Sequence, residues 1–214
     1  MTQEADGIWR ADMLDRYPMD SNAMVADLDA PRRELIMTYV AEATRTLELA
    51  EALRELARRY PRQLRVKELF ETVEAYKRIG QNIYERWRAR RVRRVYDLCA
   101  GHGLLGVLLA NRFPKLPVLC VDAEPRPAYE HLRAVAAEKS LPLENLSYEG
   151  ADVADVAPAP GSYVICIHAC NELTQTVLDH AASAGACFAA APAATARRPR
   201  RASGGSTAAW RWRC

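Results

Sequence analysis

Residues 95–106 read VYDLCAGHGLLG, and this stretch decides the fold. A short apolar run leads into Asp97, then into the pattern G-x-G-x-x-G, and then directly into a second apolar run. A strand, a glycine-rich turn and a helix in this order are typical of the ligand-binding end of a Rossmann-like unit. The stretch therefore predicts an α/β domain with a ligand at the end of its first strand.

The three glycines of the turn are expected to have separate roles. Gly101 permits the tight turn after the strand, Gly103 lets a ligand approach the backbone, and Gly106 lets the helix pack closely on the sheet. The start of the helix presents unpaired N–H groups and a partial positive charge. We therefore expect all three glycines to contribute to a cofactor-binding site.

Asp97 favours one cofactor over another. In NAD enzymes the start of this helix meets a pyrophosphate, and a carboxylate at position 97 would lie awkwardly beside that group. S-adenosylmethionine (SAM) carries a carboxylate and an ammonium instead, and Asp97 can hold the ammonium directly or through water. The sequence therefore favours SAM, with an NAD(P)-linked oxidoreductase as an alternative.

The regular pattern of short apolar runs and helical runs extends over residues 93–192. Such alternation predicts a parallel sheet with right-handed crossovers, whose strand ends gather at one edge. Strands are predicted at 93–98, 117–122, 145–149, 162–168 and 185–191, and helices at 103–112, 126–139 and 172–183.

Two further carboxylates follow predicted strands. Asp122 ends the second strand, 19 residues after Gly103, where a carboxylate accepts hydrogen bonds from both ribose hydroxyls. Asp152 follows the third strand, where it can accept a hydrogen bond from an adenine amino group. Both are therefore candidate cofactor-binding residues at the same edge as the glycine-rich turn.

Four motifs of the chain resemble those of a known family. DLCAGHG (97–103), VDAEP (121–125) and EGAD (149–152) resemble, in this order, the first three motifs of class I SAM-dependent methyltransferases. IHACNELT (167–174) resembles the H-A-C-x-x-L-T signature of the methyltransferase-like 25 group. The resemblance implies that the cofactor is bound by Asp97, Gly101, Gly103, Asp122 and Asp152, and that His168, Asn171 and Glu172 face the methyl group or the substrate.

The expected reaction is methyl transfer from SAM by in-line attack of a substrate nucleophile. Positioning of the two reactants supplies most of the acceleration in such a reaction. Glu172 or His168 can accept a proton if the nucleophile carries one. The acceptor is either RNA or a small molecule.

Residues 1–92 are expected to form a helical extension. Apolar residues at helical spacing predict one long helix from about residue 31 to residue 60 and a second to about residue 91, together a helical hairpin. The first residues are acidic and contain no apolar core of a secretory signal. No run reaches 18 apolar residues, so no membrane span is expected.

The composition changes abruptly after Pro192. Ala193 and Ala194 stand where the resembled group has two cysteines, and residues 193–214 are rich in Ala, Arg and Ser. We expect a disordered tail and a SAM-binding domain of residues 93–192, truncated after its fifth strand. The exposed edge of that strand would suit pairing with a partner, so a non-catalytic SAM-binding or interaction module is the other alternative.

The cysteines and the charge pattern suggest where the protein works and what it binds. Six cysteines show no C-x-x-C spacing, which predicts reduced thiols in a cytoplasmic protein and no metal site.

The net charge is only +3, but residues 86–94 read RWRARRVRR. This run either binds RNA phosphates, with Trp87 stacking on a base, or forms a solvated helix face with Trp87 in the core.

Overall fold

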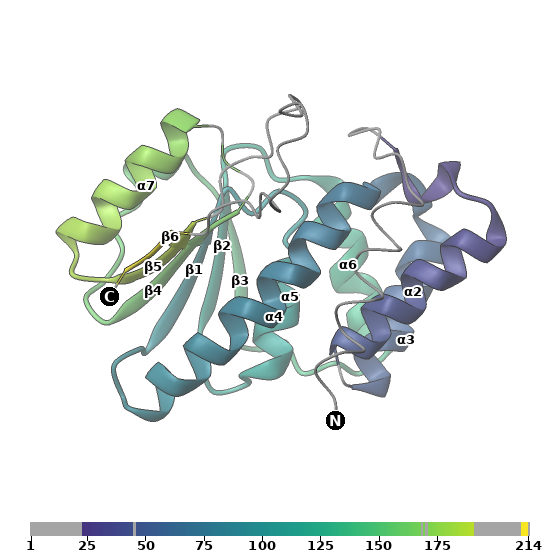
Figure 1. Cartoon of the computed structure of the whole chain (residues 1–214), viewed down its shortest axis with the longest axis horizontal. Helices are drawn as coiled ribbons and strands as arrows, with labels where there is room; N and C mark the ends of the chain where they lie inside the picture. Colours follow the sequence, from purple (N-terminus) through teal and green to yellow (C-terminus); the bar gives the residue numbers. More distant parts are fainter. Residues whose placement is uncertain (1–22, 45, 168, 170, 191–210, 214) are drawn as a thin grey trace, which may run out of the picture.

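The computed structural model describes residues 23–44, 46–167, 169, 171–190 and 211–213. Its centre is one sheet of six strands in the order β3-β2-β1-β4-β5-β6 (Figure 1). The strands are β1 (Arg94–Leu98), β2 (Val118–Asp122), β3 (Leu146–Gly150), β4 (Ser162–Cys166), β5 (Cys187–Ala190) and β6 (Arg211–Arg213). The first five are parallel, which confirms the predicted α/β, Rossmann-like fold.

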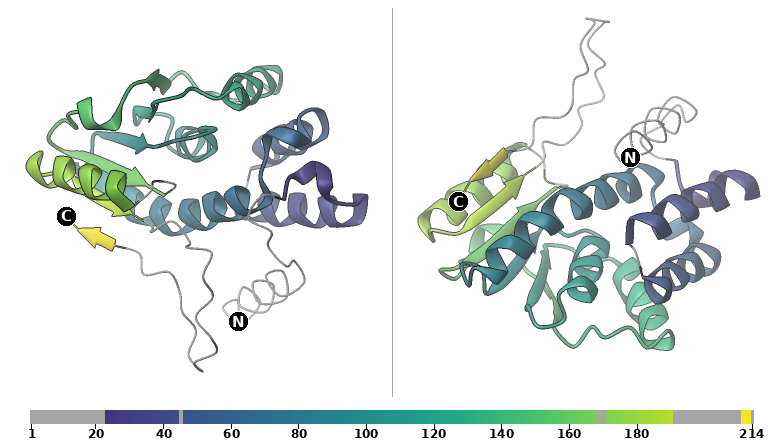
Figure 2. Two further views of the ribbon diagram at one scale, coloured as in Figure 1. Left: turned by 90° about the horizontal axis from the view of Figure 1, so that it is seen from above. Right: turned by 60° about the horizontal axis from the view of Figure 1, so that its bottom comes forward.

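The sixth strand corrects the expectation of a bare edge on strand five. β6 runs antiparallel to β5, with Ala189 opposite Trp212, and Figure 2 shows it as the outermost strand. The prediction of a disordered tail is therefore wrong for residues 211–213, while residues 191–210 and 214 lie outside the described residues. Backbone groups of an open edge gain hydrogen bonds from any extended segment that reaches them, whatever its composition.

Helices cover both faces of the sheet. α4 (Val66–Arg88), α5 (Leu104–Arg112) and α6 (Pro127–Glu138) lie on one side, and α7 (Asn171–Ser183) lies on the other (Figure 1). Alternate residues of each strand point to opposite faces. In β1, Val95 belongs to the core under α4 and α5, whereas Tyr96 belongs to the core under α7.

The predicted long helix over residues 31–60 is two helices, so that expectation is wrong. α2 (Ala30–Thr44) and α3 (Leu47–Arg59) are separate, and Thr46 between them has an extended backbone. The hydroxyl of Thr44 donates a hydrogen bond to the carbonyl of Ala41 at 3.0 Å. Threonine competes in this way for backbone groups and fits a helix interior poorly, which accounts for a break here.

The N-terminal helices share a hydrophobic core with the sheet. Ile36 of α2, Leu53 of α3 and Ile79 of α4 are buried in the same cluster as Val107 of α5 and Val135 of α6. The helical extension thus packs against α5 and α6 on their side of the sheet, with α3 on α6 and α4 on α5. Among the described residues, no helix combines the length and the apolar character needed to cross a membrane.

The cysteines differ from the expectation of six reduced thiols. Cys99, Cys120 and Cys166 are free, but Cys187 is disulfide-bonded. The expectation is therefore wrong for Cys187. Cys170 and Cys214 lie outside the part of the chain that the structure describes.

Candidate functional site

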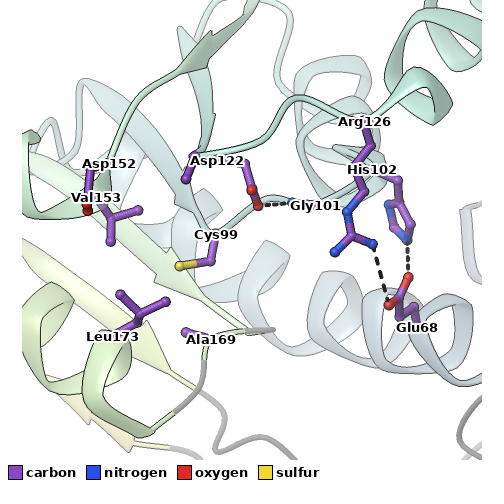
Figure 3. A pocket seen from close by; sticks show the side chains of 11 residues that line it. Glu68, Cys99, Gly101, His102, Asp122, Arg126, Asp152, Val153, Ala169 and Leu173 are labelled. Atoms are coloured by element: carbon purple, nitrogen blue, oxygen red, sulfur yellow. Dashed lines mark hydrogen bonds and ion pairs between the residues drawn. The ribbon is translucent and has the colours of Figure 1, made fainter.

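A pocket of about 380 Å³ opens at the carboxyl ends of the parallel strands (Figure 3). Its size is within the range of small-molecule sites, and its place is where Rossmann-like sheets bind ligands. Its lining consists of Glu68, Cys99, Gly101, His102, Asp122, Ala123, Arg126, Asp152, Val153, Ala169 and Leu173.

The glycine-rich turn is fixed from two sides. Gly101 has a positive φ of 56°, as the predicted tight turn requires. Its N–H donates a hydrogen bond to Oδ2 of Asp122 at 2.8 Å, and its carbonyl accepts one from the hydroxyl of Tyr148 at 2.7 Å. A backbone held at both its donor and its acceptor gives the pocket a rigid wall.

Asp122 lies where the sequence predicts it, at the end of β2 and facing the pocket. Its Oδ1 accepts a hydrogen bond from the N–H of Glu124 at 3.2 Å, in addition to the bond from Gly101 to Oδ2. Each carboxylate oxygen can accept more than one hydrogen bond. The side chain is thus held in place and still able to accept hydrogen bonds from a ligand.

Asp152 also lies in the pocket wall. It caps the short turn η3 (Val153–Asp155), since its Oδ1 accepts a hydrogen bond from the N–H of Ala154 at 2.9 Å. Figure 3 shows Asp122 between Asp152 and the turn at Gly101. The two carboxylates predicted from separate strands therefore meet at one site.

Asp97 lies deeper than expected. It is 2% exposed within β1, in register with Cys120 of β2 and Ile165 of β4, and it is not among the described residues that line the pocket. Its contact with the ammonium of SAM stays a prediction.

The other two glycines serve packing. A Cβ at Gly103, which has a φ of 70°, would come within 2.8 Å of the ring of Tyr129. Tyr129 and Tyr148 lie together beside this glycine, with ring centroids 4.3 Å apart, and the approach of a ligand to Gly103 stays a prediction. A Cβ at Gly106 would overlap the sulfur of Cys120, which agrees with the predicted close packing of helix on sheet.

The predicted substrate-facing residues are only partly described. His168 and the side chain of Asn171 lie outside the described residues. Glu172 is exposed in the first turn of α7 and does not line the pocket, but its neighbour Leu173 does. The connection from β4 to α7 thus reaches the pocket, and the roles of these three residues stay predictions.

Sequence reasoning missed a charged cluster on the opposite wall. Glu68 of α4 lies 3.6 Å from Nε2 of His102 and 3.9 Å from the guanidinium of Arg126, through different carboxylate oxygens (Figure 3). The N–H of Leu104 donates a hydrogen bond to Nδ1 of His102 at 3.1 Å, which places the ring proton on Nε2. His102 therefore covers the N-terminus of α5. Only its place in the glycine-rich turn hinted at this role, and no sequence signal pointed to Glu68.

Cys99 lines the floor of the same pocket. It has a positive φ of 61°, which is unusual for a residue other than glycine. Its interaction with the thiol of the fully buried Cys166 of β4 lowers the pKa of the Cys99 thiol. The same interaction, together with burial, raises the pKa of Cys166.

The basic run of residues 86–94 lies away from the pocket. Trp87 is half-buried and packs edge-on against Phe113, with centroids 6.1 Å apart, so its ring contributes to the core, and stacking on a base stays a prediction. The run connects α4 to the start of β1, at the amino ends of the parallel strands, whereas the pocket lies at their carboxyl ends (Figure 1). Five arginines there are exposed, namely Arg88, Arg90, Arg91, Arg93 and Arg94.

The profile of a family described as "Methyltransferase domain" matches residues 62–192, more than half of the chain. The chain belongs to this methyltransferase family. The match begins within the helical segment, before α4, and so includes Glu68 as well as the glycine-rich turn. Among the described residues of this methyltransferase, no group of three or more His, Cys, Asp or Glu side chains is arranged to hold a metal ion.

Two curated relatives are similar to parts of the methyltransferase. Ribosomal RNA small subunit methyltransferase G of Bordetella avium is 31% identical over 140 residues, 64% of this chain and 56% of the relative. A glutathione S-transferase C-terminal domain-containing protein of Xenopus laevis is 30% identical over 98 residues, 46% of this chain and 15% of the relative. The chain thus spans about half of one of these relatives and a small part of the other.

Solved structures of methyltransferases are also similar to this chain. The apo form of the SAM-dependent methyltransferase SibL has 22% identity and a TM-score of 0.42, covering 87% of this chain and 55% of that one. PKMT2 from Rickettsia typhi in complex with AdoHcy has 16% identity and a TM-score of 0.37, covering 47% and 21%.

Proposed function

We propose that this methyltransferase binds SAM in the pocket beside Gly101 and transfers the methyl group to RNA. The observation that carries the proposal is the carboxylate of Asp122, which is bonded to the Gly101 turn and faces the pocket. SAM supplies a methyl group on a positively charged sulfur, which activates that group for displacement. The H-A-C-x-x-L-T stretch further suggests that the chain is a member of the methyltransferase-like 25 group.

The charges of the pocket suit a cationic cofactor. Glu68, Asp122 and Asp152 contribute three carboxylates to the lining, against the single guanidinium of Arg126 among the described lining residues. Opposite charges attract across such distances, most strongly where water is partly excluded. We expect Asp122 to accept hydrogen bonds from the ribose hydroxyls and Asp152 to accept one from the adenine amino group.

The same features argue against a dinucleotide. A pyrophosphate needs the free N–H groups at the start of the helix after the turn. Here His102 accepts the hydrogen bond of the Leu104 N–H and is itself only 4% exposed. A pyrophosphate would have to displace this ring and lie close to Asp122, so NAD(P) is disfavoured.

Protein groups contribute mainly by holding the reactants in place. The Gly101 turn is fixed by Asp122 and Tyr148, and the apolar side chains of Val153 and Leu173 cover part of the pocket. Fixed partners of this kind lower the entropic cost of in-line attack. His102 is a poor proton acceptor, because its Nδ1 is engaged and its Nε2 carries the proton. His168 and Glu172 remain the proposed acceptors.

RNA is proposed as the acceptor for two reasons. The relative from Bordetella avium is named as a ribosomal RNA methyltransferase. The exposed arginines between α4 and β1 can neutralise phosphates. They lie around the start of β1, away from the pocket, and a five-residue strand measures about 17 Å at roughly 3.3 Å per residue. They would therefore hold a segment of RNA distant from the methylated nucleotide.

Cofactor binding is tested by calorimetric titration with SAM, S-adenosylhomocysteine and NADH. We expect both sulfur compounds to bind and NADH not to bind. Asp122→Asn should weaken binding about tenfold or more, which corresponds to ~1.4 kcal/mol. Glu124→Gln, two positions further along, is the matched control and should bind as the wild type does. Tighter binding of NADH than of SAM would overturn the assignment.

Acceptor use is tested with SAM labelled on its methyl group, incubated with total RNA, with protein and with a small-molecule extract. Label in the RNA fraction alone is the expected result. Arg91→Ala combined with Arg93→Ala should flatten the salt dependence of RNA binding, by about 0.7 in the logarithmic slope for each lost contact to a single strand. Arg32→Ala combined with Arg62→Ala removes the same charge elsewhere and should leave the slope unchanged. Binding of SAM without transfer to any fraction would favour a non-catalytic module.

A further inference from the structure

Two thiols meet at the floor of the pocket. Cys99 follows β1 and Cys166 ends β4, and these are neighbouring parallel strands. Their register pairs Asp97 with Ile165, so Cys99 lies one position beyond the level of Cys166. Neighbouring strands lie about 4.8 Å apart, and a disulfide joins Cα atoms about 4.4–6.8 Å apart. Cys99 packs against the hydrophobic cluster that contains Cys166. Their positions are therefore compatible with a covalent bond between the sulfurs.

The two thiols differ in access. Cys99 is half-buried and lines the pocket, and Figure 3 shows its sulfur between Asp122 and Ala169. Cys166 is fully buried behind it. A reagent that enters the pocket thus reaches Cys99 first, and Cys166 is reached only through Cys99.

We propose that Cys99 and Cys166 form an oxidisable dithiol site, at which a peroxide reacts with Cys99 from the pocket and Cys166 then closes a disulfide. The thiolate of Cys99 attacks one oxygen of the peroxide, so an S–O bond forms, the O–O bond breaks, and the leaving oxygen departs as water or alcohol. The sulfur of Cys166 then attacks the sulfenic acid of Cys99. An S–S bond forms, the S–O bond breaks, and water leaves with the proton of the Cys166 thiol.

The surroundings support this order of events. The thiolate is the reactive form of cysteine, and the interaction with Cys166 lowers the pKa of Cys99 despite the nearby carboxylates of Asp97, Asp122 and Asp152. An accessible thiol of lowered pKa beside a second thiol is the usual arrangement of redox-sensitive cysteines. Cys120 is a contrast within the same fold, because it is fully buried under α5 and burial raises its pKa well above the ordinary value.

The site is tested on the whole folded chain with hydrogen peroxide, followed by non-reducing peptide mapping. We expect a Cys99–Cys166 disulfide in the wild type. In the Cys166→Ser variant, oxidation should stop at a sulfenic acid on Cys99, which dimedone traps. In the Cys99→Ser variant, Cys166 should stay unmodified. Cys120→Ser is the control and should form the disulfide at the wild-type rate. In the wild type, Cys99 should react faster than Cys120, because Cys120 is fully buried and burial raises its pKa.

Three results would overturn the proposal. They are equal reactivity of Cys99 and Cys120, a disulfide from Cys99 to Cys170 instead of Cys166, or modification of Cys166 in the Cys99→Ser variant. Saturation with S-adenosylhomocysteine should slow oxidation of Cys99, because the compound would occupy the pocket. Only this part of the test rests on the proposed function. A disulfide that forms equally fast with and without that compound would support the dithiol and count against SAM in this pocket.

Discussion

Glu68 of α4 places a carboxylate oxygen 3.6 Å from Nε2 of His102 in the glycine-rich turn. The two residues are 34 positions apart in the sequence. Through this contact the helix that precedes the sheet becomes part of the pocket wall. The family match, which begins at residue 62, includes both residues.

Glu68→Gln should weaken SAM binding about tenfold, or ~1.4 kcal/mol, because it keeps the shape of the side chain and removes the charge that faces His102 and Arg126. Calorimetric titration measures the change. Glu71→Gln is the matched control, since Glu71 lies on the same helix and pairs with Lys67 outside the pocket. Equal weakening in both variants would show that only the general charge of α4 matters.

Tyr148→Phe should lower both the free energy of unfolding, by about 0.5–1.5 kcal/mol, and the affinity for SAM. It removes the hydroxyl that donates to the carbonyl of Gly101 at 2.7 Å. Denaturant titration and calorimetry measure the two effects.

The control for Tyr148 is Tyr163→Phe. The hydroxyl of Tyr163 is buried and has no hydrogen-bond partner among the described residues, so its removal should be neutral or stabilising. A larger loss of stability from Tyr163→Phe than from Tyr148→Phe would contradict this account of the turn.

Gly106→Ala should destabilise the fold by about 1–3 kcal/mol, because the new Cβ would overlap the sulfur of Cys120. In the background of Cys120→Ala the same substitution should cost clearly less, since the clashing atom is gone. Denaturant titration of the four proteins of this double-mutant cycle measures the coupling. If the stability costs of Gly106→Ala and Cys120→Ala simply add, the loss of stability does not come from a clash between these two positions.

Glu55 should make stability depend on acid pH. Hydrogen bonds from Arg58 and Arg59 lower its pKa from 4.5 to about 2. A carboxyl whose pKa is lowered by folding stabilises the folded state above its unfolded pKa, and this contribution is lost as the pH falls through the folded pKa. The melting temperature should therefore fall between pH 4.5 and about 2. The melting temperature of the Glu55→Gln variant should fall less steeply over this pH range. Glu48 is exposed, so the melting temperature of Glu48→Gln should change with pH as that of the wild type does.

Local sequence determined the elements that carry the cofactor site. The strand, turn and helix of residues 95–106 follow from contacts between near neighbours, and so does the positive φ at Gly101. Asp122 and Asp152 could be placed at one edge because parallel strands end together. These inferences need only the periods of strands and helices and the order of elements along the chain.

Tertiary structure alone decided the rest. The contact of Glu68 with His102, the meeting of Cys99 with Cys166 and the addition of β6 to β5 each join segments that are distant in the sequence. Such contacts depend on how whole helices pack and which strands become neighbours, and neither leaves a period in the local sequence. The packing of Tyr129 over Gly103 belongs to the same group, because a glycine that makes room for a distant ring is, in sequence, indistinguishable from one that makes room for a ligand.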